Sequence, residues 1–413
     1  MTARYYDIII IGTGLSGLYS AMNIKETSPT TSFLLLEKYK KQWIGGRSSN
    51  ETFYGTEIVT GAGIGRKAKD RTLYGLLRDF NLETWDFEIR PHFSSLLQPV
   101  DIKKVMDMLK REYNIQKHSR LTFKEFASPL LGNRLYEQFV LTSGYSDYEN
   151  EDAYETLYHY GMEDNRCCWT AFHVPWKKLV MKMYHKIGEQ HFKFSQNVTQ
   201  ISKVGEHPCL FQIETEKGIQ YLCNRVIVAT TIDTVRKLLP QYPIYRDIEG
   251  QSFLRLYGKF TQKSVPILKE FIPNLTIVPG PLQKICPMDA DKGVYMIAYN
   301  DNKNTLALKD YRKNTPENRE LYSRLIERSL NMPHNSIHLT AIKDFYWPVA
   351  THYYKPLNRR LYGSREEFIR QAQHPEKGIL VVGEAVSRNH GWTHGAFESS
   401  KKAVTKAWIH NEC

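Results

Sequence analysis

Three glycines near the amino terminus have the spacing of a dinucleotide-binding turn. Gly12, Gly14 and Gly17 form a GxGxxG pattern directly after the apolar run 7–11, and the acid Glu37 follows Gly17 by about 20 residues. Glycines at these positions permit a tight turn and close approach of a pyrophosphate, and the acid can accept hydrogen bonds from ribose hydroxyls. The motif therefore predicts a dinucleotide site at Gly12, Gly14, Leu15, Ser16, Gly17, Glu37 and Lys38.

The elements that must hold this motif alternate between strands and helices. Residues 7–11 are typical of a strand buried on both faces, 18–25 of a helix, and 33–36 of a second strand that ends at Glu37. Further strands are predicted at 192–202, 211–221, 225–229, 251–263 and 378–382, and helices at 71–80 and 397–408. At this length the chain should form two or three domains.

Several segments resemble the flavin amine oxidases, a family that includes monoamine, polyamine and L-amino-acid oxidases. The resemblance rests on the GxGxxG unit, on Gly45-Gly46-Arg47, on the strand 225–229, and on Gly383-Glu384 followed by HGWTHGA at 390–396. It implies an α/β fold in which a Rossmann-like FAD-binding domain is interleaved with a mixed α+β substrate domain. We expect the FAD-binding domain in residues 1–80, 195–245 and 375–413, and the substrate domain in 81–194, mainly helical, and 246–374, a sheet with helices.

The resemblance implies FAD as the cofactor. The guanidinium of Arg47 would reach the diphosphate, because its fork suits paired phosphate oxygens, and the turn 60–66 would pass beneath the isoalloxazine. No cysteine occurs in 348–356, where monoamine oxidases tether their flavin, so we expect non-covalent binding. The further contacts implied are Gly45, Gly46, Arg47, Gly61, Ala62, Gly63, Ile64, Val198, Ala229, Thr230, Trp347, Gly383, Glu384, Trp392, Thr393 and Ala396.

The resemblance also implies a reaction. Hydride would pass from a carbon bearing an amine to flavin N5, giving an imine, and molecular oxygen would reoxidise the flavin to give hydrogen peroxide. The substrate is then a small amine or amino acid. Arg66 lies near the position where L-amino-acid oxidases bind the substrate carboxylate, which favours an amino acid. Trp392 corresponds to one wall of the family's aromatic cage, and His352 and Tyr353 lie near the place of the second wall.

The family usually places a lysine beside flavin N5, and this chain has two candidates for that position. Arg255 stands in the place of the lysine in the predicted strand 251–263, and Lys259 is the alternative. Both face the same side of the strand, but four residues of strand separate them by about 13 Å. Only one of them can therefore reach N5, and we expect Arg255 there.

Two other interpretations stay open. The same fold and cofactor serve FAD oxidoreductases with non-amine substrates. A flavin-binding structural or interaction protein with little catalysis is the second alternative, because the VPGG-type turn expected around Val174 reads Val174-Pro175-Trp176-Lys177.

Composition and charge indicate a cytoplasmic protein. The 413 residues carry a formal net charge of +12, but Lys and Arg are scattered, so a nucleic acid is not expected as a partner, although the charge leaves one open. No apolar run reaches the roughly 20 residues of a membrane helix, and residues 1–6 do not resemble a signal peptide. Six cysteines without a CxxC pair predict free thiols and no metal site, and a homo-oligomer stays open.

Overall fold

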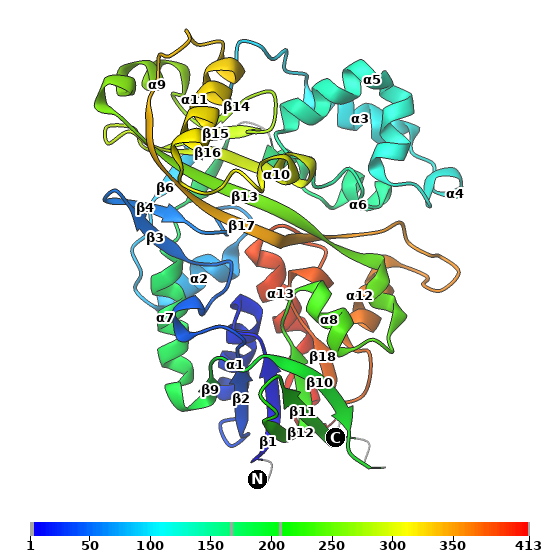
Figure 1. Cartoon of the computed structure of the whole chain (residues 1–413). Helices are drawn as coiled ribbons and strands as arrows, with labels where there is room; N and C mark the ends of the chain where they lie inside the picture. The colour runs from blue at the N-terminus through cyan, green and yellow to red at the C-terminus, as the bar shows by residue number, and fades with distance from the viewer. Residues whose placement is uncertain (1–3, 166–167, 206–208, 412–413) are drawn as a thin grey trace.

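Two β-sheets, each covered by helices, lie one above the other in the computed structural model of the chain (Figure 1). The structure describes residues 4–165, 168–205 and 209–411. The sheet in the lower half of Figure 1 has the strand order β10-β11-β12-β1-β2-β9, with β18 paired to β12. Its strands are β1 (Arg4–Ile11), β2 (Phe33–Leu36), β9 (Phe192–Lys193), β10 (Val198–Lys203), β11 (Phe211–Thr215), β12 (Gln220–Val228) and β18 (Ile379–Val381).

The centre of this sheet is parallel and buried on both faces. β1 pairs in parallel with β2 and β12, and its four consecutive isoleucines alternate between two hydrophobic clusters. Ile8 and Ile10 pack with α1 (Leu15–Thr27), α7 (Trp176–Ile187) and α13 (Thr393–Ala403). Ile9 and Ile11 pack with α8 (Ile232–Leu238) and α12 (Arg365–Gln373) on the opposite face. This double burial explains why the strand is an unbroken apolar run.

The second sheet has the strand order β17-β13-β16-β15-β14-β7 and lies above the first in Figure 1. Its long central strand β13 (Ile248–Phe260) pairs antiparallel with β17 (Leu339–Tyr354) and β16 (Val294–Asp301). The other strands and their covering helices are β7 (His92–Phe93), β14 (Thr276–Ile277), β15 (Lys284–Asp289), α9 (Val265–Phe271), α10 (Asn302–Leu308) and α11 (Pro316–Leu330).

A helical group lies beside the second sheet, at the upper right of Figure 1. It consists of α3 (Ile102–Glu112), α4 (Ile115–His118), α5 (Phe123–Ser143) and α6 (Ala153–Tyr158). Helices α3, α5 and α6 share their own hydrophobic cluster. Short strands connect the two sheets: β3 (Asn50–Phe53) with β4 (Thr56–Val59), and β5 (Gly65–Arg66), β8 (Trp169–Phe172) and β6 (Asp86–Ile89). The remaining helices are α2 (Arg71–Asp79) and α14 (Lys406–Asn411).

The predicted fold class is confirmed, and several details differ from expectation. The division into five segments stays a prediction, but α7 and β9 pack on the first sheet although they fall within 81–194, and α12 does so although it falls within 246–374. The helix expected at 397–408 is two helices, α13 and α14. Cys168 and Cys209 each take part in a disulfide bond, so the expectation of free thiols was wrong for these two residues. Cys223 and Cys286 are free, and Cys167 and Cys413 lie outside the described residues.

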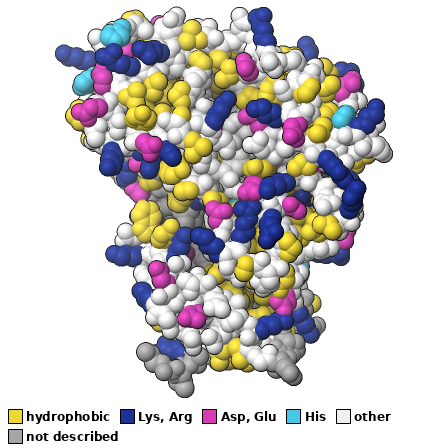
Figure 2. Space-filling view, turned by 45° about the vertical axis from the view of Figure 1, so that its right-hand side comes forward, with side chains coloured by type: hydrophobic (Ala, Val, Ile, Leu, Met, Phe, Trp, Pro, Cys, Tyr) yellow, Lys and Arg dark blue, Asp and Glu magenta, His cyan; other side chains and the backbone are white. Residues whose placement is uncertain are grey.

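Figure 2 shows the distribution of charge over one face of the molecule. Lys and Arg side chains are dispersed there among Asp and Glu side chains rather than merged into one basic area. Within the described part of the chain, no helix combines the length and the apolar character needed to cross a bilayer.

Candidate functional site

The glycines of the first turn have three different surroundings, which match the three roles of a dinucleotide motif. A side-chain carbon at Gly12 would lie 2.4 Å from the carbonyl oxygen of Ala229, and one at Gly17 would lie 2.1 Å from that of Gly12. A carbon at Gly14 would meet nothing within 4 Å. Gly12 and Gly17 therefore permit the close packing of β1, α1 and β12, while Gly14 faces the open space that a pyrophosphate requires.

Glu37 directly follows β2 and is fixed by the residues around it. Its Oε2 accepts hydrogen bonds from the Thr13 amide (3.0 Å) and hydroxyl (2.7 Å), and Oε1 accepts one from the Tyr39 amide (3.0 Å). The Glu37 carbonyl accepts the amide of Gln196 (2.8 Å), which brings the start of β10 with its buried residue Val198 to this end of the sheet. Lys38 is exposed at this site, with its ammonium over the ring of Tyr39.

Arg47 connects the second and third glycine turns. The second turn is attached to the first by the Gly45 amide, which donates to the Thr13 carbonyl (2.9 Å). The carbonyl of Arg47 accepts the Ala62 amide (2.8 Å), and a side-chain carbon at Gly61 would lie 2.4 Å from this oxygen. Its guanidinium donates to the Ala350 carbonyl and lies 3.9 Å from the Glu384 carboxylate.

Glu384, three residues after the end of β18, is buried among hydrogen-bond donors. Its Oε1 accepts the amides of His352 and Gly391, both at 2.9 Å, and its Oε2 lies 2.6 Å from Nδ1 of His352. Burial opposes ionisation, but the contacts with His352, His390 and Arg47 hold the pKa of Glu384 well below its usual range. Glu384 is therefore a fixed carboxylate beside the guanidinium of Arg47.

His352 was predicted to bind substrate, and the structure places its ring between Glu384 and the amide of Ile232. It is buried, with Nδ1 at Glu384 and Nε2 accepting the amide of Ile232 (3.2 Å), so both ring nitrogens are used. Tyr353 lies on the opposite side of β17 from its neighbour, paired with Glu249, and burial together with Glu249 raises its pKa. Because side chains alternate along β17, these two neighbours face opposite sides of the sheet and cannot both form a second wall opposite Trp392.

The third turn is clamped by tryptophan and arginine side chains. The indole nitrogens of Trp347 and Trp176 donate to the carbonyls of Thr60 (2.7 Å) and Gly63 (2.9 Å). Arg255, on β13, donates from Nε to the Gly61 carbonyl (2.7 Å), and a side-chain carbon at Gly63 would lie 3.2 Å from its Nη2. The buried guanidinium of Arg255 thus lies against the turn that should pass beneath the flavin ring.

Lys259 does not reach this turn. Tyr257, two residues beyond Arg255, donates to the Val59 carbonyl, and Lys259 donates to the carbonyl of Lys292 near the C-terminal end of β13. The two candidates do share one face of the strand, but only Arg255 is level with Gly61 and Gly63. Arg255 therefore stays the predicted residue for the N5 position, in preference to Lys259.

Arg66 is already neutralised by acids. Its guanidinium contacts Asp70 through Nε (3.3 Å) and Nη2 (2.9 Å) and Asp164 through Nη1 (2.8 Å), and only 5 % of the side chain is exposed. Its Cζ also lies 4.0 Å from the ring centre of Trp392, which packs edge-on against Trp169 at 6.3 Å. Arg66 therefore supports Trp392 and has two carboxylates bound before any substrate arrives.

The helix α13 begins directly after Trp392. Thr393 is its first residue, and its buried hydroxyl has no hydrogen-bond partner among the described residues. Ala396 packs against the hydrophobic cluster that contains α1. A side-chain carbon placed on Gly383 would lie 3.7 Å from the hydroxyl oxygen of Ser16. Ala229 and Thr230 follow β12 at the same edge of the sheet as the GxGxxG turn.

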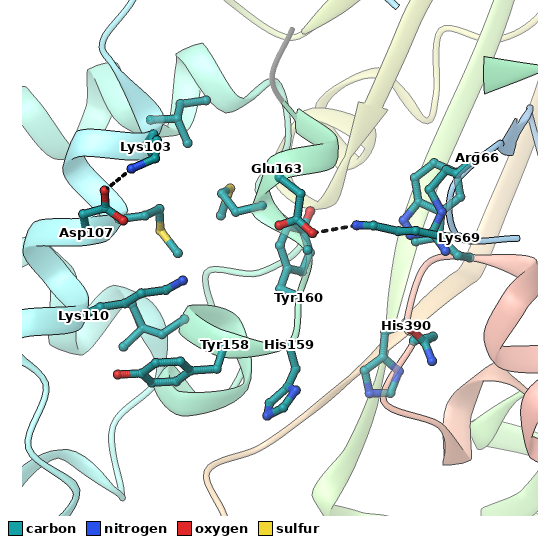
Figure 3. A pocket seen from close by; sticks show the side chains of 17 residues that line it. Arg66, Lys69, Lys103, Asp107, Lys110, Tyr158, His159, Tyr160, Glu163 and His390 are labelled. Carbon is teal, nitrogen blue, oxygen red and sulfur yellow. Dashed lines mark hydrogen bonds and ion pairs between the residues drawn. The ribbon is translucent and has the colours of Figure 1, made fainter. Parts of the chain in front are cut away.

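A pocket of about 390 Å³ adjoins Trp392 and Arg66 (Figure 3). One wall is α3, and the others are the segment 157–163 and the loop before α13. Its lysines are largely paired, since Lys103 contacts Asp107 and Lys69 contacts Glu163, both at 2.6 Å. The pocket therefore has a mixed polar wall that ends on the predicted cage tryptophan.

Sequence reasoning missed a buried polar cluster next to Arg255. The Arg255 Cζ lies 4.1 Å from the ring centre of Tyr299, and Lys284 lies over the same ring, with its ammonium donating to the Gly144 carbonyl (2.5 Å). Burial lowers the pKa of Lys284 well below its usual value. Asp147 and Asp301 lie close enough to oppose this shift. These residues come from separate segments without a motif, so no sequence signal pointed to them.

The residues around the three turns fit FAD. Gly14 and Gly46 face open space, and buried hydroxyls of Thr351 and Thr393 have no hydrogen-bond partner among the described residues. The N-terminus of α1 and the guanidinium of Arg47 suit a diphosphate, and Glu37 suits a ribose. The N-terminus of α13 suits a ring oxygen that becomes negative on reduction.

Comparisons with known proteins agree with this geometry. Residues 15–407 match a family model described as flavin containing amine oxidoreductase. Wild-type putrescine oxidase bound to putrescine has a TM-score of 0.74 at 13% identity, over 98% of this chain and 99% of that chain. A double mutant of putrescine oxidase scores 0.76 at 13% identity, covering 98% and 99%. Cyclohexylamine oxidase from Brevibacterium oxydans scores 0.74 at 14% identity, covering 98% of each chain. Among curated proteins, no sequence matches the chain.

Proposed function

The chain belongs to the flavin-containing amine oxidoreductase family, and on this basis we propose that it uses FAD to oxidise simple amines rather than amino acids. The observation that carries the choice of substrate is the state of Arg66. Its guanidinium already contacts the carboxylates of Asp70 and Asp164 in a buried position. Lys69 shares Asp164 with Arg66 and contacts Glu163, so two cations already face three acids. A substrate carboxylate would add a fourth negative charge, which the low-dielectric surroundings disfavour. The putrescine and cyclohexylamine oxidases of similar fold are named for amines without a carboxylate.

We assign the residues of the chain to binding and orientation. When bound, FAD would supply the two-electron acceptor for the hydride of the carbon that bears the amine, and oxygen would take up those electrons as hydrogen peroxide. Arg47 and the N-terminus of α1 hold the diphosphate, and Arg255 fixes the turn beneath the ring through Gly61. Trp392, supported by Arg66, orients the amine and excludes water.

The test pairs each amine with the amino acid of the same side chain, for example phenethylamine with phenylalanine. Purified protein should release FAD on acid precipitation, and the amine of each pair should bleach the flavin faster without oxygen. Readmission of oxygen should then yield one hydrogen peroxide per flavin. Faster bleaching by the amino acids would overturn the choice of substrate, and a protein that cannot be reconstituted with FAD would overturn the cofactor assignment.

Arg66→Ala separates the two substrate classes further. Because the arginine supports Trp392 and does not bind substrate in this proposal, the variant should lower kcat/KM for an amine and its amino acid by the same factor. If KM increases for amino acids alone, Arg66 binds the substrate carboxylate, as the sequence predicted.

A further inference from the structure

A buried carboxylate and a threonine side chain approach the residue that precedes Trp392. A side-chain carbon placed on Gly391 would lie 3.7 Å from Cγ2 of Thr351 and 4.0 Å from Oδ2 of Asp147. The Thr351 hydroxyl is buried and has no hydrogen-bond partner among the described residues. Asp147 is 9 % exposed. The Thr351 side chain and the Asp147 carboxylate thus both lie beside Gly391, next to the predicted cage tryptophan.

The position of Asp147 is fixed by its loop. This loop, residues 144–152, follows α5, and the amide and hydroxyl of Ser146 donate to Asp301 at 2.7 Å and 2.5 Å. Gln251 of β13 donates to the carbonyl of Asp147 (2.7 Å). The carboxylate is oriented by Tyr160, whose hydroxyl donates to Oδ1 (2.6 Å). The backbone amide of Asp147 itself also donates to the carboxylate, and among the described side chains only that of Tyr160 does so.

The charges around Asp147 leave it able to take up a proton near neutral pH. Burial is the largest influence and raises its pKa to about 7, Asp301 raises it as well, and the hydroxyl of Tyr160 and the ammonium of Lys284 oppose the increase. The titratable side chains that interact with it are Tyr145, Tyr148, Glu151, Tyr160, Lys284 and Asp301. Tyr160 also lines the pocket beside Trp392, as Figure 3 shows, so Asp147 lies directly behind the pocket wall.

We propose that Asp147 binds the ammonium group of the substrate through Oδ2, with the Thr351 hydroxyl as second acceptor, and removes one proton from it. This inference rests on the proposed amine substrate and names the group that recognises it. The N–H bond of the alkylammonium breaks, its electron pair stays on nitrogen, and the proton forms an O–H bond on Oδ2. The products are a neutral amine and a neutral carboxylic acid. Only the neutral amine has the free electron pair that assists loss of hydride from the adjacent carbon.

Binding is tested first with amines that cannot be oxidised. tert-Butylamine and 2-phenylpropan-2-amine lack a hydrogen on the carbon that bears nitrogen, so the flavin spectrum of the holoenzyme reports binding alone. Wild type should bind at least one of them at pH 8, and Asp147→Asn should weaken that binding at least tenfold at equal FAD content. Asp79→Asn, a change in an exposed acid on α2, is the control and should bind like wild type. No binding to wild type, or equal binding to wild type and Asp147→Asn, overturns the proposal.

The pH profile of kcat/KM with an oxidisable amine gives a second test. In wild type, kcat/KM should rise to a plateau near pH 7, because the free enzyme must have Asp147 ionised. In Asp147→Asn it should be about 100-fold lower at pH 7.5 and rise without a plateau up to the pKa of the amine. Tyr160→Phe removes the hydrogen bond that lowers the pKa of Asp147, so the rise should move to higher pH. An unchanged profile in Asp147→Asn overturns the proposal.

The two sets of results separate this inference from the proposed function. Probe binding that depends on Asp147, without oxidation of any amine, would retain the ammonium site and reject the amine oxidase function. If amines are oxidised, but the pH profile and the probe binding are the same in wild type and Asp147→Asn, the function is retained and the ammonium site is rejected.

Discussion

His352 and Glu384 form a buried pair in which each residue fixes the other. The Nε2 of His352 accepts the Ile232 amide, so Nδ1 carries the proton and donates to Glu384 across 2.6 Å. The same carboxylate lies 3.9 Å from the guanidinium of Arg47, the residue that we assign to the FAD diphosphate. β17, β18 and α8 are therefore joined at one point next to the cofactor site.

Removal of the imidazole should weaken both folding and FAD binding. In His352→Ala the Glu384 carboxylate and the Ile232 amide lose a buried partner, which should lower the free energy of unfolding by about 1–3 kcal/mol. Urea unfolding of the apoprotein measures the first effect and FAD titration the second. His410→Ala, at an exposed position of α14, should change neither quantity. Full FAD affinity in a destabilised His352→Ala would show that the pair serves the fold alone.

Alanine at Gly17 should prevent folding, whereas alanine at Gly14 should weaken FAD binding. In Gly17→Ala the new carbon would lie 2.1 Å from a backbone oxygen, so we expect little folded protein. In Gly14→Ala it would enter open space at φ −68°, so the apoprotein should fold with a stability within about 1 kcal/mol of wild type. FAD should nevertheless bind at least tenfold more weakly, about 1.4 kcal/mol, because the carbon occupies the phosphate space. Gly75→Ala, in open space on α2, is the matched control.

Arg255→Met and Lys259→Met should differ in flavin kinetics. The guanidinium of Arg255 contacts the Gly61 carbonyl at the turn beneath the predicted flavin position, whereas Lys259 contacts only the distant Lys292 carbonyl. At equal FAD content, Arg255→Met should change the rate of anaerobic flavin reduction or of reoxidation at least tenfold in stopped-flow measurements. Lys259→Met should stay within twofold of wild type. If the two variants have identical flavin kinetics, the assignment of Arg255 to the position beside flavin N5 is wrong.

The parts of the fold that the sequence predicted are those with a local physical signal. The isoleucine run of β1 needs burial on both faces, the glycines of the first turn need close backbone approach, and Glu37 ends the next strand; each appears in one short window. The family resemblance then supplied the order of the segments. Element boundaries were less accurate, because α7 and β9 join the first sheet only through long-range packing.

The substrate side of the site could not be derived in the same way. Arg66 follows a glycine turn and was expected to be available, but Asp164, almost 100 residues later, pairs with it. Asp147 lies next to Gly391 only because the loop after α5 folds against the C-terminal segment. Such contacts depend on side chains from distant segments meeting in the fold, and no spacing rule in a single sequence reports them.

Asp147 should also make the stability of the protein depend on pH. The folded protein holds the Asp147 proton up to a pH of about 7, whereas the unfolded chain releases it near the ordinary value of 3.8. Between these values unfolding releases a proton, so raising the pH favours unfolding and this group lowers the free energy of unfolding by up to on the order of 4 kcal/mol. Asp147→Asn should remove this contribution. As the pH is raised from 4 to 7, the free energy of unfolding of the variant should therefore increase relative to that of wild type. Urea unfolding of the apoproteins at intervals across that range measures it. A constant difference over the whole range would show that Asp147 titrates alike in the folded and unfolded chains, and it would then be ionised in the free enzyme well below neutral pH.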